Sequence, residues 1–423
     1  IEQLEPVFHL SKNGKNVIVI MQDRCFSPLV PYIFEEKPEL KTRFDGFTFF
    51  PNTVSFGIYT MIGTPGIFGG YDYTPFEINR RTEKTLQQKH NEAILSMPLV
   101  FSQNGWNATV ADMPYENYLE YPVTEMYQDY PQVERIETHG IYSDIWYQQN
   151  GMKATPFLSS QIKRNFILFS FFKMVPPVLR DIVYHRDYWL SYNPYDDTAK
   201  FIDNYSEIDF LPELTDFSSD KNAFLLLDNE ATHESILLQP PEYVPVENVT
   251  DLGDGEFSTE PQFSSMVGIF MRLADFFDYL KENDVYDNTR IIIVSDHGMG
   301  LSMPSFTPFK NEKASFPFKK ENVTATLIIK DFGAHNPLTT DMTFMTNADT
   351  PALATDKVIA DARNPFTKSL FAVENKDEYV KIMVAPGEST RNRNNRQFKV
   401  SSNQWFTVKD DIFEDANWQQ YAP

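Results

Sequence analysis

An aspartate and a histidine stand side by side at positions 296 and 297, directly after the apolar run 291–294 and directly before a glycine. Carboxylate oxygen and imidazole nitrogen both suit Zn²⁺ or Mn²⁺. The pair can face one ion because the chain can turn sharply at Gly298. The pattern therefore indicates a metal site that includes Asp296 and His297, and an aspartate that caps a turn beside an ordinary histidine is the alternative.

A second group with chemical potential lies in the glycine-rich segment 55–70, which reads as a loop and carries the hydroxyls of Ser55, Tyr59, Thr60 and Thr64. A hydroxyl is a poor nucleophile at its usual pKa, but coordination to a divalent metal activates it for attack on phosphorus or sulfur. Backbone N–H groups of such a loop can also hold the anionic group that is transferred. Taken alone, the segment is equally typical of a structural turn.

The elements that must position these residues are predicted to form an α/β layer structure. Apolar runs indicate buried strands that end at polar residues, and a helix, a turn at Gly105 and a strand are expected over 95–112. An amphipathic helix is expected over 264–282. The other four strands are placed within 15–23, 223–234, 290–298 and 324–333. Because open α/β sheets bind ligands at the carboxyl ends of their strands, that edge is the predicted active site.

Composition narrows the class of protein. The 423 residues are 42% apolar, enough for a large core, and the net charge of −22 argues against nucleic-acid binding. The single cysteine, Cys25, excludes internal disulfides and a cysteine-rich zinc site. The apolar stretch 165–183 is interrupted by Lys173 and two prolines, so it is not expected to span a membrane.

The C-terminal part has a different pattern from the rest. Four short strand-like segments follow residue 366, separated by polar turns. They are 369–374, 378–385, 396–402 and 404–410. We therefore predict a sulfatase-type three-layer α/β sandwich over 1–365, with a mixed and mainly parallel sheet, and a small antiparallel subdomain over 366–423.

Four motifs in order resemble the catalytic domain of lipoteichoic acid synthases and phosphoglycerol transferases, in the alkaline phosphatase and sulfatase superfamily. They are NVIVIMQD at 16–23, YTMIGTP at 59–65, FLLLDNEATHES at 224–235 and IIIVSDHG at 291–298. The resemblance covers about residues 15–360. It implies that Asp23, Thr60, Asp296 and His297 bind one divalent ion, Mn²⁺ in the first place and Mg²⁺ or Zn²⁺ as alternatives.

The resemblance also implies roles in catalysis and substrate binding. Thr60 would be the nucleophile, since Pro65 follows it at the family's spacing of five residues. His233 would contact the substrate phosphate and could protonate the leaving alcohol. Contacts with the head group would come from His139 and Trp146, and Arg24 could meet phosphate oxygens.

Two residues depart from the family's pattern. Asp23 stands where the synthases usually have glutamate, and Gln148 stands where they have an arginine near the head group. Sulfatases, the nearest competitor, need a C-x-P-x-R motif that is absent around Cys25. A two-metal phosphatase would need more histidines, and phosphoethanolamine transferases typically carry disulfides. A phosphodiester hydrolase and a catalytically silent lipid- or glycan-binding domain remain alternatives.

The resemblance places this chain outside the cytoplasmic membrane. It implies a phospholipid or cell-envelope glycolipid as substrate and an N-terminal transmembrane domain that precedes Ile1. The aromatic segment 166–172 is the one apolar surface expected to face the bilayer or that domain, with burial in the core as the alternative.

Overall fold

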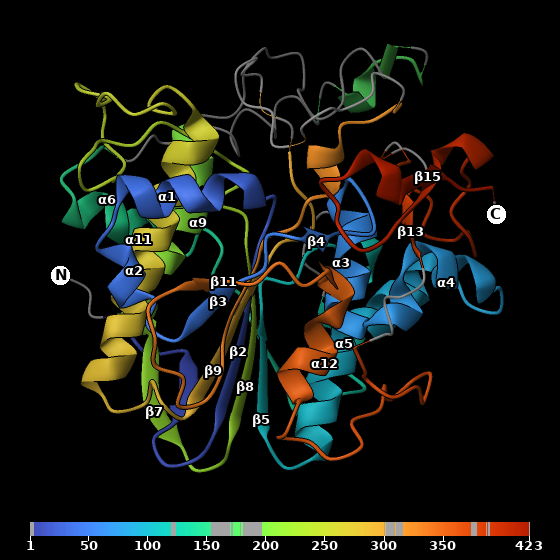
Figure 1. Cartoon of the computed structure of the whole chain (residues 1–423), viewed down its shortest axis with the longest axis horizontal. Helices are drawn as coiled ribbons and strands as arrows, with labels where there is room; N and C mark the ends of the chain where they lie inside the picture. The colour runs from blue at the N-terminus through green and yellow to red at the C-terminus, as the bar shows by residue number, and fades with distance from the viewer. Residues whose placement is uncertain are drawn as a thin grey trace.

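An eight-stranded mixed sheet lies between two layers of helices (Figure 1). Its strand order is β11-β3-β10-β9-β2-β8-β5-β6. The strands are β2 (Asn16–Gln22), β3 (Phe47–Phe49), β5 (Asn107–Ala111), β6 (Val133–Ile136), β8 (Ala223–Asn229), β9 (Thr289–Val294), β10 (Leu327–Lys330) and β11 (Thr339–Thr340). This computed structural model describes residues 4–119, 124–153, 170, 172–177, 179–180, 197–299, 301, 309, 316–373, 379–385, 387 and 390–422.

Strand β2 forms the centre of the sheet because both of its faces are apolar. It pairs in parallel with β8 on one side and with β9 on the other. Ile18 and Ile20 belong to the core on one face, whereas Val17 and Val19 belong to the core on the other. The continuous apolar run in the sequence is thus typical of a strand buried on two sides.

Two groups of helices cover the two faces of the sheet (Figure 1). One layer contains α1 (Val30–Glu36), α2 (Leu40–Arg43), α6 (Ser143–Gln149), α9 (Asp197–Asp209), α10 (Leu211–Leu214) and α11 (Pro261–Glu282). The other contains α3 (Thr60–Gly69), α4 (Pro75–Arg80), α5 (Leu86–Gln103) and α12 (Thr350–Thr355). This arrangement confirms the predicted three-layer α/β fold and the predicted helix that leads into β9.

The predicted mixture of strand directions is also confirmed. The strands β9, β2, β8, β5 and β6 are parallel neighbours, whereas β10 is antiparallel to both β9 and β3. Two small parallel pairs lie outside this sheet. They are β1 (Phe8–Ser11) with β7 (Thr215–Ser219), and β4 (Thr53–Val54) with β12 (Met345–Thr346).

The C-terminal region forms a separate antiparallel sheet of three strands, as predicted in kind. The strands are β13 (Val380–Met383), β14 (Trp405–Val408) and β15 (Trp418–Gln420). The predicted strand over 396–402 is wrong, and the described part of 369–374 contributes only a bridge between Arg363 and Leu370. Phe398 instead packs into the core beside α5, so its apolar side chain marks burial rather than a strand.

The small sheet packs against the larger domain through a shared apolar cluster. Ile382 and Phe406 lie in the same cluster as Val54 and Phe56, which precede α3. The amide of Met383 donates to the carbonyl of Phe56 at 3.0 Å. The boundary between the predicted domains, at residues 365 and 366, stays a prediction.

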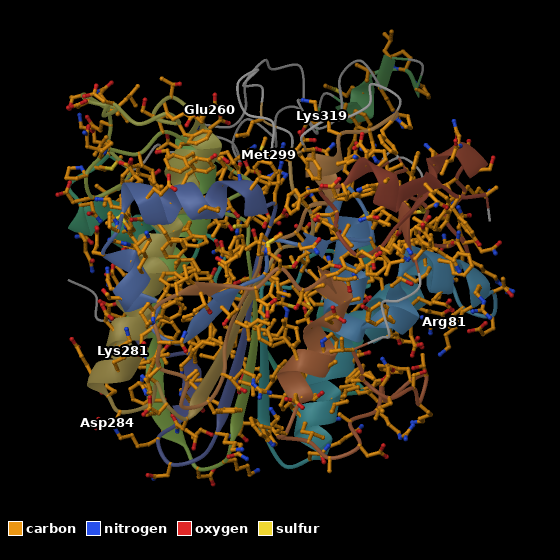
Figure 2. The ribbon with its side chains drawn as sticks, in the orientation of Figure 1. Arg81, Glu260, Lys281, Asp284, Met299 and Lys319 are labelled. Atoms are coloured by element: carbon orange, nitrogen blue, oxygen red, sulfur yellow. The ribbon has the colours of Figure 1, made fainter. Side chains whose placement is uncertain are left out.

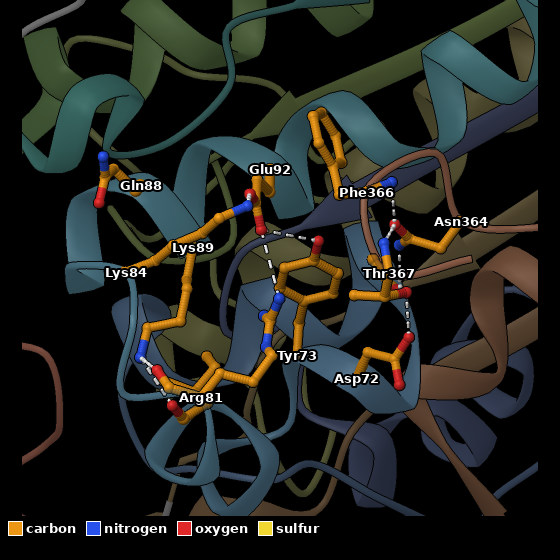
Figure 3. A network of polar contacts seen from close by, with 12 residues as sticks. Asp72, Tyr73, Arg81, Lys84, Gln88, Lys89, Glu92, Asn364, Phe366 and Thr367 are labelled. Carbon is orange, nitrogen blue, oxygen red and sulfur yellow. Dashed lines mark hydrogen bonds and ion pairs between the residues drawn. The ribbon is translucent and has the colours of Figure 1, made fainter. Parts of the chain in front are cut away.

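Polar contacts fasten the layer that carries α3 and α5 (Figure 3). Glu92 on α5 accepts hydrogen bonds from the Tyr73 hydroxyl and from Arg81, each at 3.3 Å, and pairs with Lys84. Asn364, beyond α12, donates to Ser96 Oγ at 2.8 Å. These contacts hold α5 in place, and α3 packs directly against α5.

Within the part of the chain that the structure describes, no helix is long and apolar enough to cross a membrane. The predicted membrane-facing segment 166–172, with Phe171 in it, lies almost entirely outside the described residues.

Candidate active site

The carboxyl ends of β2 and β9 bring two predicted metal ligands together. The strands are parallel neighbours with Met21 opposite Val294, so the residues that follow them emerge at the same edge of the sheet. Asp23 follows β2 and Asp296 follows β9, and their exposed fractions are 3% and 0%. The edge predicted from the sequence therefore carries two buried carboxylates.

Asp23, Asp296 and His297 form a group whose candidate ligand atoms all lie within 4.8 Å of one another. Nε2 of His297 is 3.5 Å from Oδ2 of Asp296 and 3.9 Å from Oδ1 of Asp23. Nδ1 of His297 lies 2.7 Å from the carbonyl of Gly298, so Nδ1 donates and Nε2 keeps its lone pair for an ion.

Two carboxylate oxygens in this group are buried without a hydrogen-bond partner, Oδ1 of Asp23 and Oδ2 of Asp296. Burial without a partner is costly for a charged oxygen. Burial raises the pKa of Asp23 well above its usual value, and the negative charges of Asp296 and Glu230 raise it further. A divalent ion would offset all three effects, so these residues fit the predicted metal.

Thr60 lies at the first position of α3 and points toward this group. Its Oγ1 donates to Oδ2 of Asp23 at 3.3 Å. The first amides of a helix have no intrahelical acceptor and carry the positive end of the helix dipole. The N-terminus of α3 thus provides both a hydroxyl and N–H donors beside the carboxylates.

The prediction that 55–70 is a loop is wrong for residues 60–69, which form α3. Gly63 allows the helix to approach β9 closely, since a Cβ there would lie 2.2 Å from the carbonyl of Asp296. Ser55 donates to the same carbonyl, and Asn347 does so at 3.1 Å. The glycines in this segment therefore indicated close packing, and the Ser55 hydroxyl holds the backbone of a metal ligand.

Two cavities meet at Thr60. The acidic cavity, of about 490 Å³, includes eight carboxylates in its lining: Asp23, Asp112, Glu116, Glu137, Asp203, Asp228, Glu230 and Glu234. The cationic cavity, of about 530 Å³, is lined by Arg24, Lys319 and Arg391 and by no described carboxylate. Lys319 and Met299 of the cationic cavity lie at the end of the molecule opposite Asp284 (Figure 2).

His233 lines both cavities, as Thr60 does. Its Nδ1 lies 3.2 Å from Oε1 of Glu234, and the hydrogen bond from His233 keeps the pKa of Glu234 below its usual value. Glu234 therefore stays ionised and holds the Nδ1 proton, which leaves Nε2 of His233 available for proton exchange.

His139 lies in the acidic cavity and is oriented by Asn204. Oδ1 of Asn204 accepts from the amide of Glu230 at 3.2 Å, and its Nδ2 donates to the carbonyl of Lys200 at 3.1 Å. Because Oδ1 is the acceptor, Nδ1 of His139, 3.1 Å away, is the donor. Nε2 of His139 is then the free ring nitrogen.

The structure does not bring Trp146 into this group. Its indole is buried, donates to Oδ2 of Asp209 at 2.8 Å and packs against Tyr205. Trp146 is not among the described residues that line the two cavities. Arg24 does line the cationic cavity, and its backbone amide donates to Oδ1 of Asp296 at 3.0 Å.

Sequence reasoning missed three residues that line the site. Asp228 and Glu230 lie in the motif from which only His233 was selected. Tyr115 lines both cavities and has a φ of 56°, in a stretch where Asn117 also has a positive φ. Acidic and aromatic residues directly after a buried strand were the available signal, and strained backbone of this kind often accompanies functional sites.

A buried carboxyl pair lies behind His139. Thr138 forms short hydrogen bonds with both Asp112 and Glu207, and Asn229 Nδ2 donates to Oε2 of Glu207 at 2.9 Å. Burial raises the pKa of Glu207 well above its usual value, and the charge of Asp112 adds to this effect. Glu207 is therefore protonated in the folded protein, where it donates to Thr138.

The folded state should lose stability as pH rises from the ordinary glutamate pKa of 4.5 toward the higher folded value, because over that window it binds a proton that the unfolded chain has released. Glu207→Gln keeps a donor toward Thr138 and an acceptor for Asn229, so it should remove this loss. The stability of the variant relative to wild type should grow by up to about 1.4 kcal/mol per pH unit. Urea denaturation across that window measures the difference, and parallel pH profiles of the two proteins would contradict the assignment.

No protein-family model matches the sequence, and a search of curated proteins found no relative. Solved structures do show similarity. A protein of the alkaline phosphatase superfamily from Vibrio parahaemolyticus matches 100% of this chain and 87% of its own, at 13% identity and a TM-score of 0.45. The lipoteichoic acid synthase LtaP from Listeria monocytogenes matches 94% of this chain and 85% of its own, at 10% identity and a TM-score of 0.45.

The soluble domain of lipooligosaccharide phosphoethanolamine transferase A from Neisseria meningitidis matches 83% of this chain and 89% of its own, at 13% identity and a TM-score of 0.37. Members of the superfamily that the sequence motifs resemble are thus among the similar structures.

Proposed function

We propose that this chain is a metal-dependent transferase that moves a phosphorus-containing group from a phospholipid or cell-envelope glycolipid to an acceptor hydroxyl. One observation carries the proposal. The Thr60 hydroxyl lies at the N-terminus of a helix, hydrogen-bonded to a carboxylate in a group of three buried metal-ligating side chains. Such an arrangement suits nucleophilic attack on an anionic ester.

Asp23, Asp296 and His297 would hold the ion, with Thr60 Oγ1 as the fourth protein ligand. Two carboxylates, an imidazole and a hydroxyl suit Mn²⁺, which we propose, and also accommodate Mg²⁺ or Zn²⁺. When bound, the ion supplies Lewis-acid chemistry, lowering the pKa of the coordinated hydroxyl and withdrawing charge from the phosphoryl oxygens.

The side chains divide the remaining tasks. Thr60 Oγ1 forms the new bond to phosphorus, while the bond from phosphorus to the leaving alcohol breaks. The proton of the hydroxyl moves along its hydrogen bond toward Oδ2 of Asp23. The N–H groups at the start of α3 bind the equatorial oxygens. His233 gives its Nε2 proton to the leaving alcohol and accepts one from the incoming acceptor in the second step.

The substrate class rests on the sequence resemblance to lipoteichoic acid synthases, which implies a phosphoglycerol donor such as phosphatidylglycerol. On the same basis we propose that the chain works on the outer face of the cytoplasmic membrane, attached to a membrane domain. Sulfatase chemistry at Cys25 finds no support, because the thiol is buried and burial raises its pKa to about 12.

Intact-mass analysis tests the proposal. The protein is incubated with Mn²⁺ and phosphatidylglycerol vesicles, and a glycerophosphoryl adduct on Thr60 is the expected result. Release of the adduct by an added alcohol would indicate a transferase, and release by water alone a hydrolase. Lipid binding without an adduct or turnover would overturn the proposal in favour of a catalytically silent domain.

A further inference from the structure

Two carboxylates in the acidic cavity have no partner. Asp228 follows Leu227 on β8, is 2% exposed, and its Oδ1 is buried without a hydrogen bond. Glu230 is partly buried and lines the same cavity. Among the residues that the structure describes, none forms a hydrogen bond or an ion pair with either carboxylate.

The neighbouring carboxylates differ because each is already paired. Arg135 binds Glu116 at 2.9 Å and Glu137 at 2.5 Å, and Lys200 lies 3.5 Å from Glu234. Arg135 and Lys200 are the two cationic side chains in the described lining of this cavity, apart from its histidines. No protein cation is therefore left to neutralise Asp228 and Glu230.

The electrostatics of the cavity support a missing cation. Burial raises the pKa of Asp228 well above its usual value, and the charges of Glu230 and Asp23 raise it further. Burial also raises the pKa of Glu230. Two carboxylates are held close together in a low-dielectric site without compensation, which is an unfavourable arrangement unless a ligand completes it.

Ligand geometry favours an ammonium group over a second metal ion. Within the described part of the chain, Asp23, Asp296 and His297 are the only three metal-ligating side chains that come within 4.8 Å of one another. Asp228 and Glu230 thus lack a third ligand. A primary ammonium needs only acceptors for its three N–H donors, and two carboxylates provide them.

We propose that Asp228 and Glu230 form a subsite for a primary ammonium group on the substrate. Thr60 and His233 line the same cavity, so an ester of a short amino alcohol would place its phosphoryl group at Thr60 and its amine at this subsite. The subsite deepens the proposed transferase function and rests on it for the position of the phosphoryl group. It narrows the substrate class to phosphodiesters with an amino-bearing substituent.

Calorimetry with two matched probes tests the subsite. 2-Aminoethylphosphonate and 2-hydroxyethylphosphonate differ only in the amine, and their carbon–phosphorus bonds resist hydrolysis. With the Mn²⁺-loaded full chain, the amino probe should bind at least about tenfold more tightly than the hydroxyl probe. Asp228→Asn and Glu230→Gln should each remove most of this difference and leave the Kd of the hydroxyl probe within about twofold.

The matched control is Glu137→Gln, which removes a carboxylate from the same cavity that Arg135 already neutralises. It should preserve the preference for the amino probe. Equal affinity of wild type for the two probes would overturn the subsite, as would variants that weaken both probes equally. A second Mn²⁺ equivalent that Asp228→Asn alone removes would also overturn it.

The outcome is separable from that of the proposed function. An adduct on Thr60 without a preference for the amino probe would refute the subsite and leave the transferase in place. A preference that depends on Asp228, without any adduct, would keep the subsite and refute covalent transfer.

Discussion

Thr60→Ala should abolish the covalent adduct and lower turnover of phosphatidylglycerol on the order of a thousandfold or more. The variant loses the only hydroxyl that donates to Asp23 from the start of α3 among the described contacts. Thr60→Ser keeps a hydroxyl at the same position and should retain measurable turnover. Rates of lipid turnover and intact masses of both variants provide the measurement.

Thr64→Val is the matched control for this experiment. Thr64 lies one turn further along α3, is buried, and uses its hydroxyl to bond the carbonyl of Thr60 at 2.7 Å. Valine preserves its shape, so the variant should keep the rate within about threefold while losing about 1 kcal/mol of stability. Full activity of Thr60→Ala, or equal losses in Thr60→Ala and Thr64→Val, would remove Thr60 from the role of nucleophile.

Asp296→Asn should weaken metal binding at least about a hundredfold and reduce turnover in proportion. Oδ1 of Asp296 accepts the amides of Arg24 and His297, whereas Oδ2 is the buried oxygen without a partner. Asparagine can keep the two accepted bonds and would present an uncharged NH₂ where the ion needs an oxygen. Metal content after dialysis and calorimetric titration with Mn²⁺ report the effect without an activity assay.

The same substitution should not destabilise the metal-free protein. The charge of Asp296 contributes to the raised pKa of Asp23, which shows that the two carboxylates repel each other. Removing one charge should therefore leave the melting temperature of the metal-free chain equal or higher. Asp284→Asn is the control, because Asp284 is exposed at the far end of the molecule and asparagine tolerates its positive φ (Figure 2). Unchanged Mn²⁺ affinity in Asp296→Asn would contradict the metal site.

The sequence was most informative where one chemical pattern admitted one structure. The apolar runs before Asp23 and Asp296 could be buried on both faces only in a parallel sheet, and parallel strands place their carboxyl ends at one edge. The metal group was therefore predictable in position. Its geometry was not, because the register between β2 and β9 depends on side-chain packing that lies far apart in the sequence.

Other parts escaped prediction for definite reasons. Glycine in 60–69 suggested a loop, but Gly63 serves the contact between α3 and the carbonyl of Asp296, which only the tertiary structure reveals. Trp146 matched a family position, yet its indole has a partner in the core. Asp228 attracted no attention because an acidic residue at a strand end is common, and its lack of a partner can be seen only when the neighbouring charges are placed.

The contact between the small C-terminal sheet and the segment before α3 has a consequence for biosynthesis. Met383 on β13 bonds the carbonyl of Phe56, and Gly57 pairs with the same residue, only three positions before Thr60. β13 is in turn completed by β14, which ends at Val408. A ribosome that has made the whole α/β sheet has therefore not yet supplied the support of the nucleophile. The nascent chain stays catalytically incompetent, next to a membrane full of potential substrate, until these late strands emerge and pair.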